Sequence, residues 1–320
     1  MLVRLGYVAM SMSLQNASPS QTMTHSQFIK IPDREAAIRK LERIAKSNLK
    51  NCLRLLRHNV ANDIEFFRLT SKIIPLANHE DVKDWNYIRP LAEELSEVKE
   101  FLLAHPKMRV DFHPDHFVVL NGEDTDVLKS SLKTLGMHRK LLMGMGIPPE
   151  HRCVLHVGGV YNDKEKALEQ FIHNWGLIPE SIQRLIMLEN DDTSFHVEDV
   201  LYLCEKLGIP LVFDIHHHLA NHENKDWTLY WERILNTWKH SALPPKIHIS
   251  SPRSEKEFKA HAEFIEPSLL LDFFHSIKGS VEQVDCMIEA KRKDEALFKL
   301  VHDLEKEASI EWVNKAAFTL

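Results

Sequence analysis

Short apolar runs recur along this chain, and six of them end in a side chain that can bind a metal ion. These runs cover residues 109–113, 153–156, 185–189, 211–214, 246–248 and 286–289, and they end in His113, His156, Glu189, Asp214, His248 and Glu289. Apolar runs of this length, separated by helix-length amphipathic segments, are typical of the buried strands of a parallel sheet. The pattern therefore predicts parallel strands whose carboxyl ends bear polar, metal-binding side chains.

The order of the elements predicts a closed barrel. Strands are expected at residues 2–8, 67–71, 109–113, 153–157, 185–189, 210–214, 246–250 and 284–289, and helices at 36–56, 90–103, 126–145, 164–175, 197–207, 227–237, 255–274 and 294–307. Strict alternation of strand and helix suits an α/β fold, a (β/α)8 TIM barrel that forms a single domain over residues 1–320. A doubly wound sheet would usually begin with a glycine-rich turn, and this chain has none.

Two segments lie outside this alternation. Residues 9–32 form a connection that is long for a loop between strand and helix, and such loops tend to be functional. Asp33 is expected to cap the helix that follows. Residues 310–320 receive no predicted role.

The polar strand ends are expected to meet in one pocket, because all strands of such a barrel open onto the same face. Further imidazoles come from His261 and from the run of histidines at 216–218, in which the pattern does not select one member. Mixed nitrogen and oxygen ligands suit Zn²⁺ or Mn²⁺, and these groups exceed the need of one ion. Two or three ions that share bridging carboxylates are therefore expected.

Each of these side chains also has a structural alternative. A histidine at a strand end is often only hydrogen-bonded, and Glu189 with the Asn-Asp-Asp that follows it could form an exposed turn. Asp214 could cap a helix that bears solvated histidines. Such explanations would have to hold independently at six strand ends, so a metal pocket is the favoured interpretation.

The net charge of −6 and the pI of about 6.4 argue at first against a nucleic-acid partner. Three divalent ions would outweigh the charge of three carboxylates, however, and an occupied pocket would be locally positive. Lys246, Arg253, Lys291 and Arg292 lie in or just after the last two predicted strands. Phosphodiester cleavage, in which one metal ion activates a water and others neutralise the phosphate, uses clusters of this kind.

Lys246 shares a strand face with His248, because side chains two residues apart on a strand point to the same side. Neighbouring cations disfavour an ammonium group there, so a neutral or carboxylated Lys246 is expected. The alternative is an ion pair with Glu189 or Glu289.

Cysteine usage and hydropathy indicate a cytoplasmic protein without a membrane partner. The four cysteines are scattered, and two lie inside predicted strands, which is typical of reduced, buried thiols. The first residues resemble a strand rather than a targeting peptide. No apolar run approaches the ~18 residues that a membrane helix needs.

Seven segments resemble the UV damage endonuclease family, and they occur in the family's order. They are Arg4-Leu-Gly-Tyr7, His113-Pro-Asp-His116-Phe117, His156-Val-Gly-Gly159, Leu188-Glu189-Asn-Asp-Asp192, Phe213-Asp214-Ile-His-His217, Lys246-Ile-His248-Ile-Ser-Ser-Pro252 and Met287-Ile-Glu289-Ala-Lys291. The resemblance implies a barrel similar to that of endonuclease IV, with up to three divalent ions, commonly Mn²⁺ and otherwise Zn²⁺, Mg²⁺ or Co²⁺. It further implies a monomeric repair enzyme that nicks double-stranded DNA immediately 5′ to pyrimidine dimers, 6-4 photoproducts and abasic sites, leaving a 3′-hydroxyl.

The resemblance also assigns the metal ligands by position, with Glu189 bridging two ions. It places His113 and His156 at the first ion, Asp214, His248 and Glu289 at the second, and His217 and His261 at the third. Lys246 corresponds to a lysine that can be carboxylated in the family. Together with Glu189 and His248 it completes the expected catalytic set.

Damage recognition in the family uses a glutamine followed by an aromatic residue, which wedge into the duplex. This chain has His116 and Phe117 instead. Phe117 keeps a stacking face, so insertion between bases at an unstacking cost of a few kcal/mol is expected. His116 lacks the paired donor and acceptor of an amide. Tyr7 and Lys291 are further expected DNA contacts, with barrel packing as the alternative role of Tyr7.

Two other functions compete with the nuclease. A Mn²⁺-dependent sugar isomerase or epimerase lines the same barrel face with Glu, Asp and His, but the third-site pair His217 and His261 and the wedge-like Phe117 favour the nuclease. A DNA-binding protein without catalysis would leave the buried carboxylates uncompensated.

Overall fold

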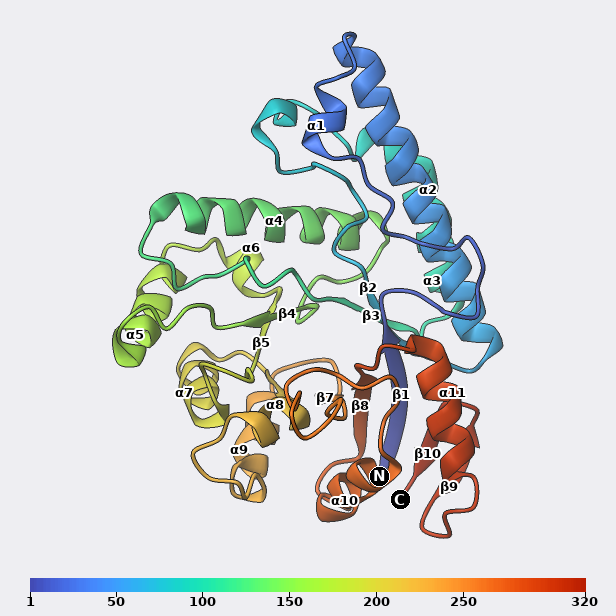
Figure 1. Ribbon diagram of the computed structural model, residues 1–320, viewed down its shortest axis with the longest axis vertical. Helices are drawn as coiled ribbons and strands as arrows, with labels where there is room; N and C mark the ends of the chain where they lie inside the picture. Colours follow the sequence, from blue (N-terminus) through green and yellow to red (C-terminus); the bar gives the residue numbers. More distant parts are fainter.

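The computed structural model describes residues 1–320 and contains a closed barrel of eight parallel strands (Figure 1). The strands are β1 (Leu2–Val8), β2 (Phe66–Leu69), β3 (Arg109–Phe112), β4 (Cys153–His156), β5 (Ile186–Glu189), β6 (Leu211–Asp214), β7 (Lys246–Ile249) and β8 (Gln283–Ile288). Neighbours in the sequence are neighbours in the sheet, and β1 pairs with both β8 and β2, which closes the barrel. The predicted TIM barrel is confirmed, and each predicted strand is found within one or two residues of its expected bounds.

Helices surround the barrel between consecutive strands. They are α1 (His25–Phe28), α2 (Arg34–Ala61), the 3-10 helices η1 (Glu80–Val82) and η2 (Arg89–Leu91), α3 (Ala92–Ala104), α4 (Thr125–Gly144), α5 (Lys164–Trp175), α6 (Glu180–Gln183), α7 (Val197–Leu207), α8 (Ile215–Ala220), α9 (Thr228–Thr237), α10 (Pro267–Ser276) and α11 (Lys293–Leu304). Asp33 caps α2 as predicted, since its carboxylate accepts a hydrogen bond from the backbone N–H of Glu35 at 2.9 Å.

The amino-terminal part of α2 projects beyond the barrel and forms a lobe with α1 and η1 (Figure 1). A small separate core holds this lobe together, and it includes Met23, Phe28, Leu41 and Val82. The long connection at residues 9–32 is therefore packed against α2, and the lobe lies beside the barrel face onto which the strands open.

The predicted helix at 255–274 is wrong in its first half. Before α10 the chain folds back on itself: Pro252 and His261 form an antiparallel bridge, and the backbone N–H of Ala262 donates to the carbonyl of Ser251 at 2.8 Å. The helix begins only at Pro267, because proline suits the first helical turn and disfavours helical geometry in the residue before it. This loop brings His261 to the barrel mouth.

Residues 310–320, which received no predicted role, form a hairpin of β9 (Glu311–Asn314) and β10 (Ala317–Thr319). β10 pairs antiparallel with the first residues of β1. Phe318 is fully buried there, with its ring centroid 5.4 Å from that of Trp312. The hairpin therefore covers the amino-terminal end of the first barrel strand.

The barrel interior below the strand ends is ionic rather than apolar. Its charged side chains are Arg4, Asp285 and Lys246, which lie side by side on β1, β8 and β7, and Arg109 and Asp111 on β3, which reach them through ion pairs inside the barrel. Neither predicted partner of Lys246 is correct, since its ammonium lies 3.3 Å from Asp111 Oδ2. Burial lowers the pKa of Lys246 to about 8, although the charge of Asp111 opposes this. Carboxylation of Lys246 stays a prediction.

All four cysteines are buried and unpaired. None of the helices combines the length and hydrophobicity that a membrane span requires.

Candidate metal centre

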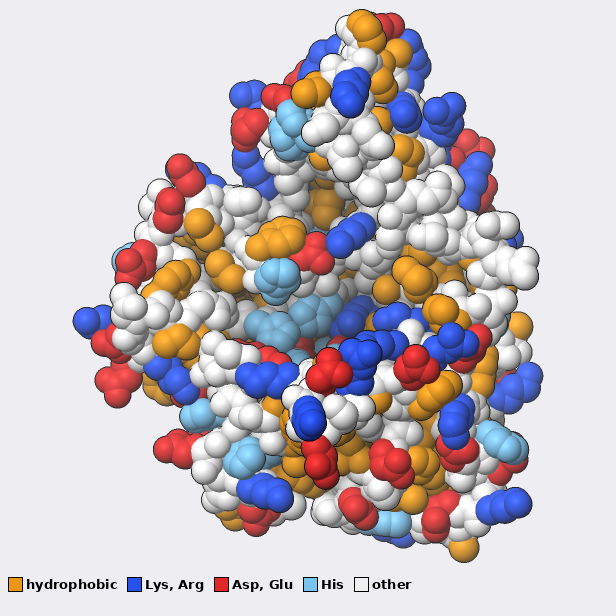
Figure 2. All heavy atoms as spheres, viewed as in Figure 1, with side chains coloured by type: hydrophobic (Ala, Val, Ile, Leu, Met, Phe, Trp, Pro, Cys, Tyr) orange, Lys and Arg blue, Asp and Glu red, His pale blue; other side chains and the backbone are white.

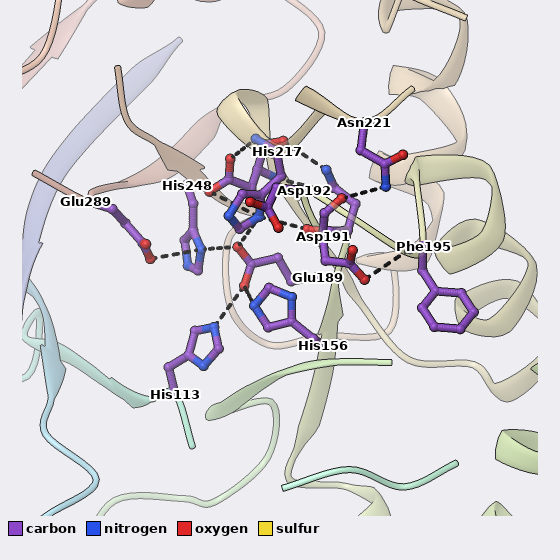
Figure 3. Close-up of polar contacts among 12 residues, drawn as sticks. His113, His156, Glu189, Asp191, Asp192, Phe195, His217, Asn221, His248 and Glu289 are labelled. Atoms are coloured by element: carbon purple, nitrogen blue, oxygen red, sulfur yellow. Dashed lines mark hydrogen bonds and ion pairs between the residues drawn. The ribbon is translucent and has the colours of Figure 1, made fainter. Parts of the chain in front are cut away.

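The predicted ligands come together at the carboxyl ends of the strands, in the arrangement drawn in Figure 3. Strand register decides which of them are neighbours: His156 on β4 lies beside Glu189 on β5, and Asp214 on β6 lies beside His248 on β7. Parallel pairing thus converts strand ends that are far apart in sequence into one cluster.

Glu189 is the centre of the cluster and is almost completely buried. Its Oε2 lies 2.9 Å from His113 Nε2 and 3.5 Å from His156 Nε2, whereas its Oε1 lies 2.8 Å from His248 Nδ1 and 3.4 Å from His217 Nδ1. One carboxylate therefore faces four imidazoles, two on each oxygen. A bridging carboxylate between two ions would need this geometry.

Three overlapping groups of side chains could each hold an ion. They are His113, His156 and Glu189; Glu189, Asp214 and His217; and Asp214, His248 and Glu289, with the ligand atoms of each group within 4.8 Å of one another. The first and third groups reproduce the first two ligand sets implied by the family resemblance, with Glu189 the member of the first that could also serve as the bridge.

Two buried atoms of the cluster have no hydrogen-bond partner: Asp214 Oδ2 and His248 Nε2. Buried polar atoms are normally paired, because an unpaired one forfeits its hydration. A carboxylate oxygen and an imidazole nitrogen are both ligands of Zn²⁺ and Mn²⁺. The residues present therefore fit a divalent cation.

Of the three consecutive histidines in α8, the middle one faces the carboxylates. The ring of His217 lies 3.7 Å from Asp214 Oδ2, and its backbone N–H donates to Asp214 Oδ1 at 2.7 Å. His216 packs against Phe258 and His218 against Phe213, so neither lies in the cluster. His261 stands at the edge, with its Nδ1 4.0 Å from Glu289 Oε2 and its ring 6.3 Å from that of His217.

The Asn-Asp pair after Glu189 shapes the loop. The amide of Asn190 accepts from the backbone N–H of Asp214 and donates to its carbonyl, both at 2.9 Å, which ties β5 to β6. The carboxylate of Asp191 accepts backbone N–H groups of the following turn, including that of Phe195 at 3.0 Å (Figure 3). A turn therefore follows Glu189, but it is not the exposed turn of the structural alternative, because Glu189, Asn190 and Asp191 are buried.

The cluster strongly shifts the protonation of its members. Burial opposes ionisation of Glu189, but the charges of His248 and His156 outweigh it and lower the pKa of Glu189 well below its ordinary value. Burial, with Glu189 and Glu289 nearby, raises the pKa of Asp214 to about 7. Although burial opposes it, the carboxylates raise the pKa of His217 to about 11. Without a metal ion, protons must balance these carboxylates, and a cation would replace them.

Two cations near the cluster were missed by the sequence interpretation. Arg68 on β2 forms an ion pair with Glu289 Oε1, and the half-buried Lys293 opens α11. Burial and the charge of Arg68 lower the pKa of Lys293. Arg68 lies inside the predicted strand at 67–71, but no local pattern shows that an arginine in one strand pairs with a carboxylate at the end of another.

The predicted DNA contacts have different positions. Phe117 and His116 are exposed, Phe117 to 65 %, and Lys291 is exposed beyond β8. Tyr7 is fully buried and donates a hydrogen bond to Asn59 Oδ1 at 2.6 Å. The expectation that Tyr7 contacts DNA is therefore wrong for this structure, and its alternative role in barrel packing is correct. The hydroxyl group found a partner in α2 that the sequence pattern could not reveal.

The surface around the cluster is hollowed (Figure 2). Histidine side chains gather at its centre, with lysine and arginine side chains along one rim. Of the basic residues expected there, Lys291 and Arg292 follow β8, whereas Lys246 is buried inside the barrel and Arg253 forms an exposed pair with Glu257. Despite the acidic net charge, the barrel face is thus bordered by positive charge.

Comparison with known proteins gives consistent matches over nearly the whole chain. The model of the family described as UV-endonuclease UvdE matches residues 3–319. A UV DNA damage endonuclease from Halalkalibacterium halodurans is 54% identical over 318 residues, which cover 99% of this chain and 98% of that protein. The crystal structure of SacUVDE superimposes with a TM-score of 0.81 at 31% identity, covering 95% of this chain and 98% of the other. Endonuclease IV from Thermus thermophilus, at 13% identity and a TM-score of 0.53 over 95% of this chain and 100% of its own, shares the fold.

Proposed function

The chain belongs to the UV-endonuclease UvdE family, whose relatives are named as endonucleases for UV-damaged DNA, and we propose that it nicks such DNA with the help of divalent metal ions. The nick lies immediately 5′ to pyrimidine dimers, 6-4 photoproducts and abasic sites and leaves a 3′-hydroxyl. The observation that supports this proposal is the buried cluster of carboxylates and imidazoles around Glu189, which fits divalent cations at the mouth of the barrel.

Up to three ions are proposed, with Mn²⁺ as the first choice. Glu189, His113 and His156 would hold one ion, and Asp214, His248 and Glu289 a second. His217 and His261 would hold the third, at the more open edge of the cluster. Ions bound in this way supply Lewis-acid activation of a water and neutralise charge on the scissile phosphate.

The side chains of the cluster have complementary tasks in this scheme. Glu189 holds two imidazoles at each of its oxygens, and the hydrogen bonds between the Asn190 amide and the Asp214 backbone hold two strand ends together. None of these groups is placed as a covalent nucleophile. The protein therefore contributes a rigid frame, because cluster members on neighbouring strands cannot move independently.

Lesion recognition is proposed for the loop after β3. Phe117 presents an exposed aromatic face, and the following Val118 is buried, which anchors the loop. An exposed aromatic ring can wedge between stacked bases and kink a duplex. His116, beside it, has a ring centroid 5.8 Å from that of Phe117.

The proposal is tested by nicking of supercoiled plasmid. Protein freed of metal with a chelator is expected to leave UV-irradiated plasmid intact, and added Mn²⁺ is expected to restore conversion to the open circular form, because the carboxylate cluster then gains its cations. Unirradiated plasmid is the control. If the Mn²⁺-loaded protein does not nick irradiated plasmid, the proposed function is wrong.

Phe117→Ala is expected to slow nicking of a dimer-containing duplex by about tenfold to a hundredfold, since base stacking on an aromatic ring contributes about 1–3 kcal/mol. Metal content should be unchanged, because Phe117 lies outside the ligand set. Nicking kinetics on oligonucleotides and elemental analysis measure the two effects. Leu229→Ala, which removes a similarly exposed apolar side chain from α9, serves as control; equal rates for both variants would remove Phe117 from the lesion site.

The alternative sugar isomerase or epimerase has no comparable support. Structures of that class share the barrel, for example a 3-keto-D-glucoside 4-epimerase from E. coli at 9% identity and a TM-score of 0.56, and this similarity concerns the fold alone. The family match favours the nuclease.

A further inference from the structure

Arg68 and Lys293 place two incompletely paired cations at the rim of the metal centre. The only side-chain hydrogen bond of Arg68 goes to Glu289, although a guanidinium carries five N–H donors. The ammonium of Lys293 donates no hydrogen bond to another residue and forms no ion pair, although Lys293 is half-buried. Arg68 is only 15 % exposed and Lys293 is half-buried, so water replaces few of the missing partners.

The two cations lie near each other through the fold rather than the sequence. Arg68 comes from β2, and Lys293 follows β8 by a short turn. Lys293 has a φ of 51°, a left-handed backbone conformation that residues other than glycine adopt rarely, because it is sterically strained. Arg68 lies opposite Val8 of β1, and the neighbouring Tyr7 lies opposite Ile288 of β8, so only β1 separates the two strand ends that bear these cations.

Glu289 cannot neutralise both cations and an ion together. Its Oε1 is shared between Arg68 and His248 Nδ1, the latter at 3.2 Å. Glu289 also belongs, with Asp214 and His248, to a group that could hold a metal ion. An ion bound there would compete with Arg68 for the carboxylate. The guanidinium would then face the open pocket with its donors available.

A phosphodiester is the ligand that suits this arrangement. Its two anionic oxygens match the fork of a guanidinium, and an ammonium adds a compact second charge. Each phosphate contact to Lys or Arg displaces counterions and makes DNA binding sensitive to salt.

We propose that Arg68 and Lys293 bind one phosphate of the DNA strand beside the ion held by Glu289, a proposal that rests on the proposed function of this same site. Arg68 exchanges Glu289 for the phosphate when the metal ion binds. Lys293 supplies the second charge. Both residues are thus part of the DNA-binding surface, in addition to the exposed Lys291.

The test measures binding of a duplex oligonucleotide with one pyrimidine dimer at several salt concentrations. All proteins carry His113→Gln, which removes a ligand of the proposed first ion to suppress cleavage and leaves Asp214, His248 and Glu289 in place, and all are supplied with Mn²⁺. Arg68→Met and Lys293→Met are each expected to weaken binding and to reduce the slope of log Kobs against log[salt] by about 1. Lys239→Met is the matched control. Lys239 is exposed and follows Trp238, whose indole N–H donates to the carbonyl of Leu211 at the start of β6, so Lys239 lies at the opposite end of the barrel from the metal centre.

A second measurement separates phosphate binding from a merely structural role. Arg68→Met with His113 intact is titrated with Mn²⁺, and its metal affinity is expected to rise several-fold, because the competitor for Glu289 is gone. Arg68→Lys should restore part of the salt slope. The proposal is overturned if both methionine variants keep the slope of the parent variant, or if Arg68→Met keeps that slope and binds Mn²⁺ more weakly. Because binding is measured without cleavage, these outcomes do not depend on whether the wild-type protein nicks UV-damaged DNA.

Discussion

Replacing Glu189 with glutamine is expected to reduce nicking of UV-damaged DNA on the order of 10³-fold or more. Glu189 faces imidazoles with both oxygens and is the only carboxylate at the centre of the cluster. An amide of the same shape cannot bridge two cations, because it offers one weakly basic oxygen and no charge. The bound metal measured by elemental analysis should fall by at least one ion per protein.

Glu232→Gln is the matched control for this variant. Glu232 lies on the exposed side of α9 and makes no ion pair or side-chain hydrogen bond. Its replacement removes the same charge from the protein and should leave both nicking and metal content unchanged. If Glu189→Gln nicked UV-damaged DNA at the wild-type rate, the proposed metal centre would be wrong.

Asp285→Ala is expected to destabilise the protein by about 3–5 kcal/mol, the effect of breaking a buried ion pair on one side. Asp285 is fully buried on β8 and accepts hydrogen bonds from Arg4 Nε and Nη2, both at 2.7 Å, and from Arg109 Nη1 at 2.9 Å. Its removal leaves the nearly inaccessible Arg109 with Asp111 as its only carboxylate partner, and Lys246 and Arg152 already share that carboxylate. For a chain of this length the melting temperature should fall by about 5–8 °C.

The comparison variant is Asp303→Asn, which breaks the exposed pair between Asp303 and Lys299 on α11. Surface pairs of this kind contribute about 0–1 kcal/mol, so its melting temperature should stay near the wild-type value. Thermal unfolding followed by circular dichroism measures both variants. Equal melting temperatures would show that the ionic layer of the barrel does not stabilise the fold.

Much of the architecture was predictable because buried parallel strands leave a strong signal. Each strand is a short apolar run, and the chemistry-bearing residue lies directly at its end, as with Glu189 at the end of β5 and Asp214 at the end of β6. The long helix α2 was predictable from its cap and its apolar stripe. Both signals are local, so neighbouring residues suffice to read them.

Other features depended on partners distant in sequence. The helical pattern near 255–274 was interrupted by a loop that pairs with itself, and Tyr7 became a core residue because Asn59 of α2 accepts its hydroxyl. The hairpin of β9 and β10 is too short to be distinctive, and it is stabilised by pairing with β1, at the other end of the sequence (Leu2 opposite Thr319).

The sequence by itself determined that this chain forms an α/β barrel with a row of metal-binding side chains at its strand ends, because strand burial and strand length are encoded locally. Only the tertiary structure decided which of these side chains are neighbours. Strand register placed His156 beside Glu189, and the start of α8 directed His217 rather than His216 or His218 toward the carboxylates. Barrel closure placed Arg68 of β2 against Glu289, which follows β8, with only β1 between the two strands. Such contacts arise from the order and stagger of strands, which no local pattern contains.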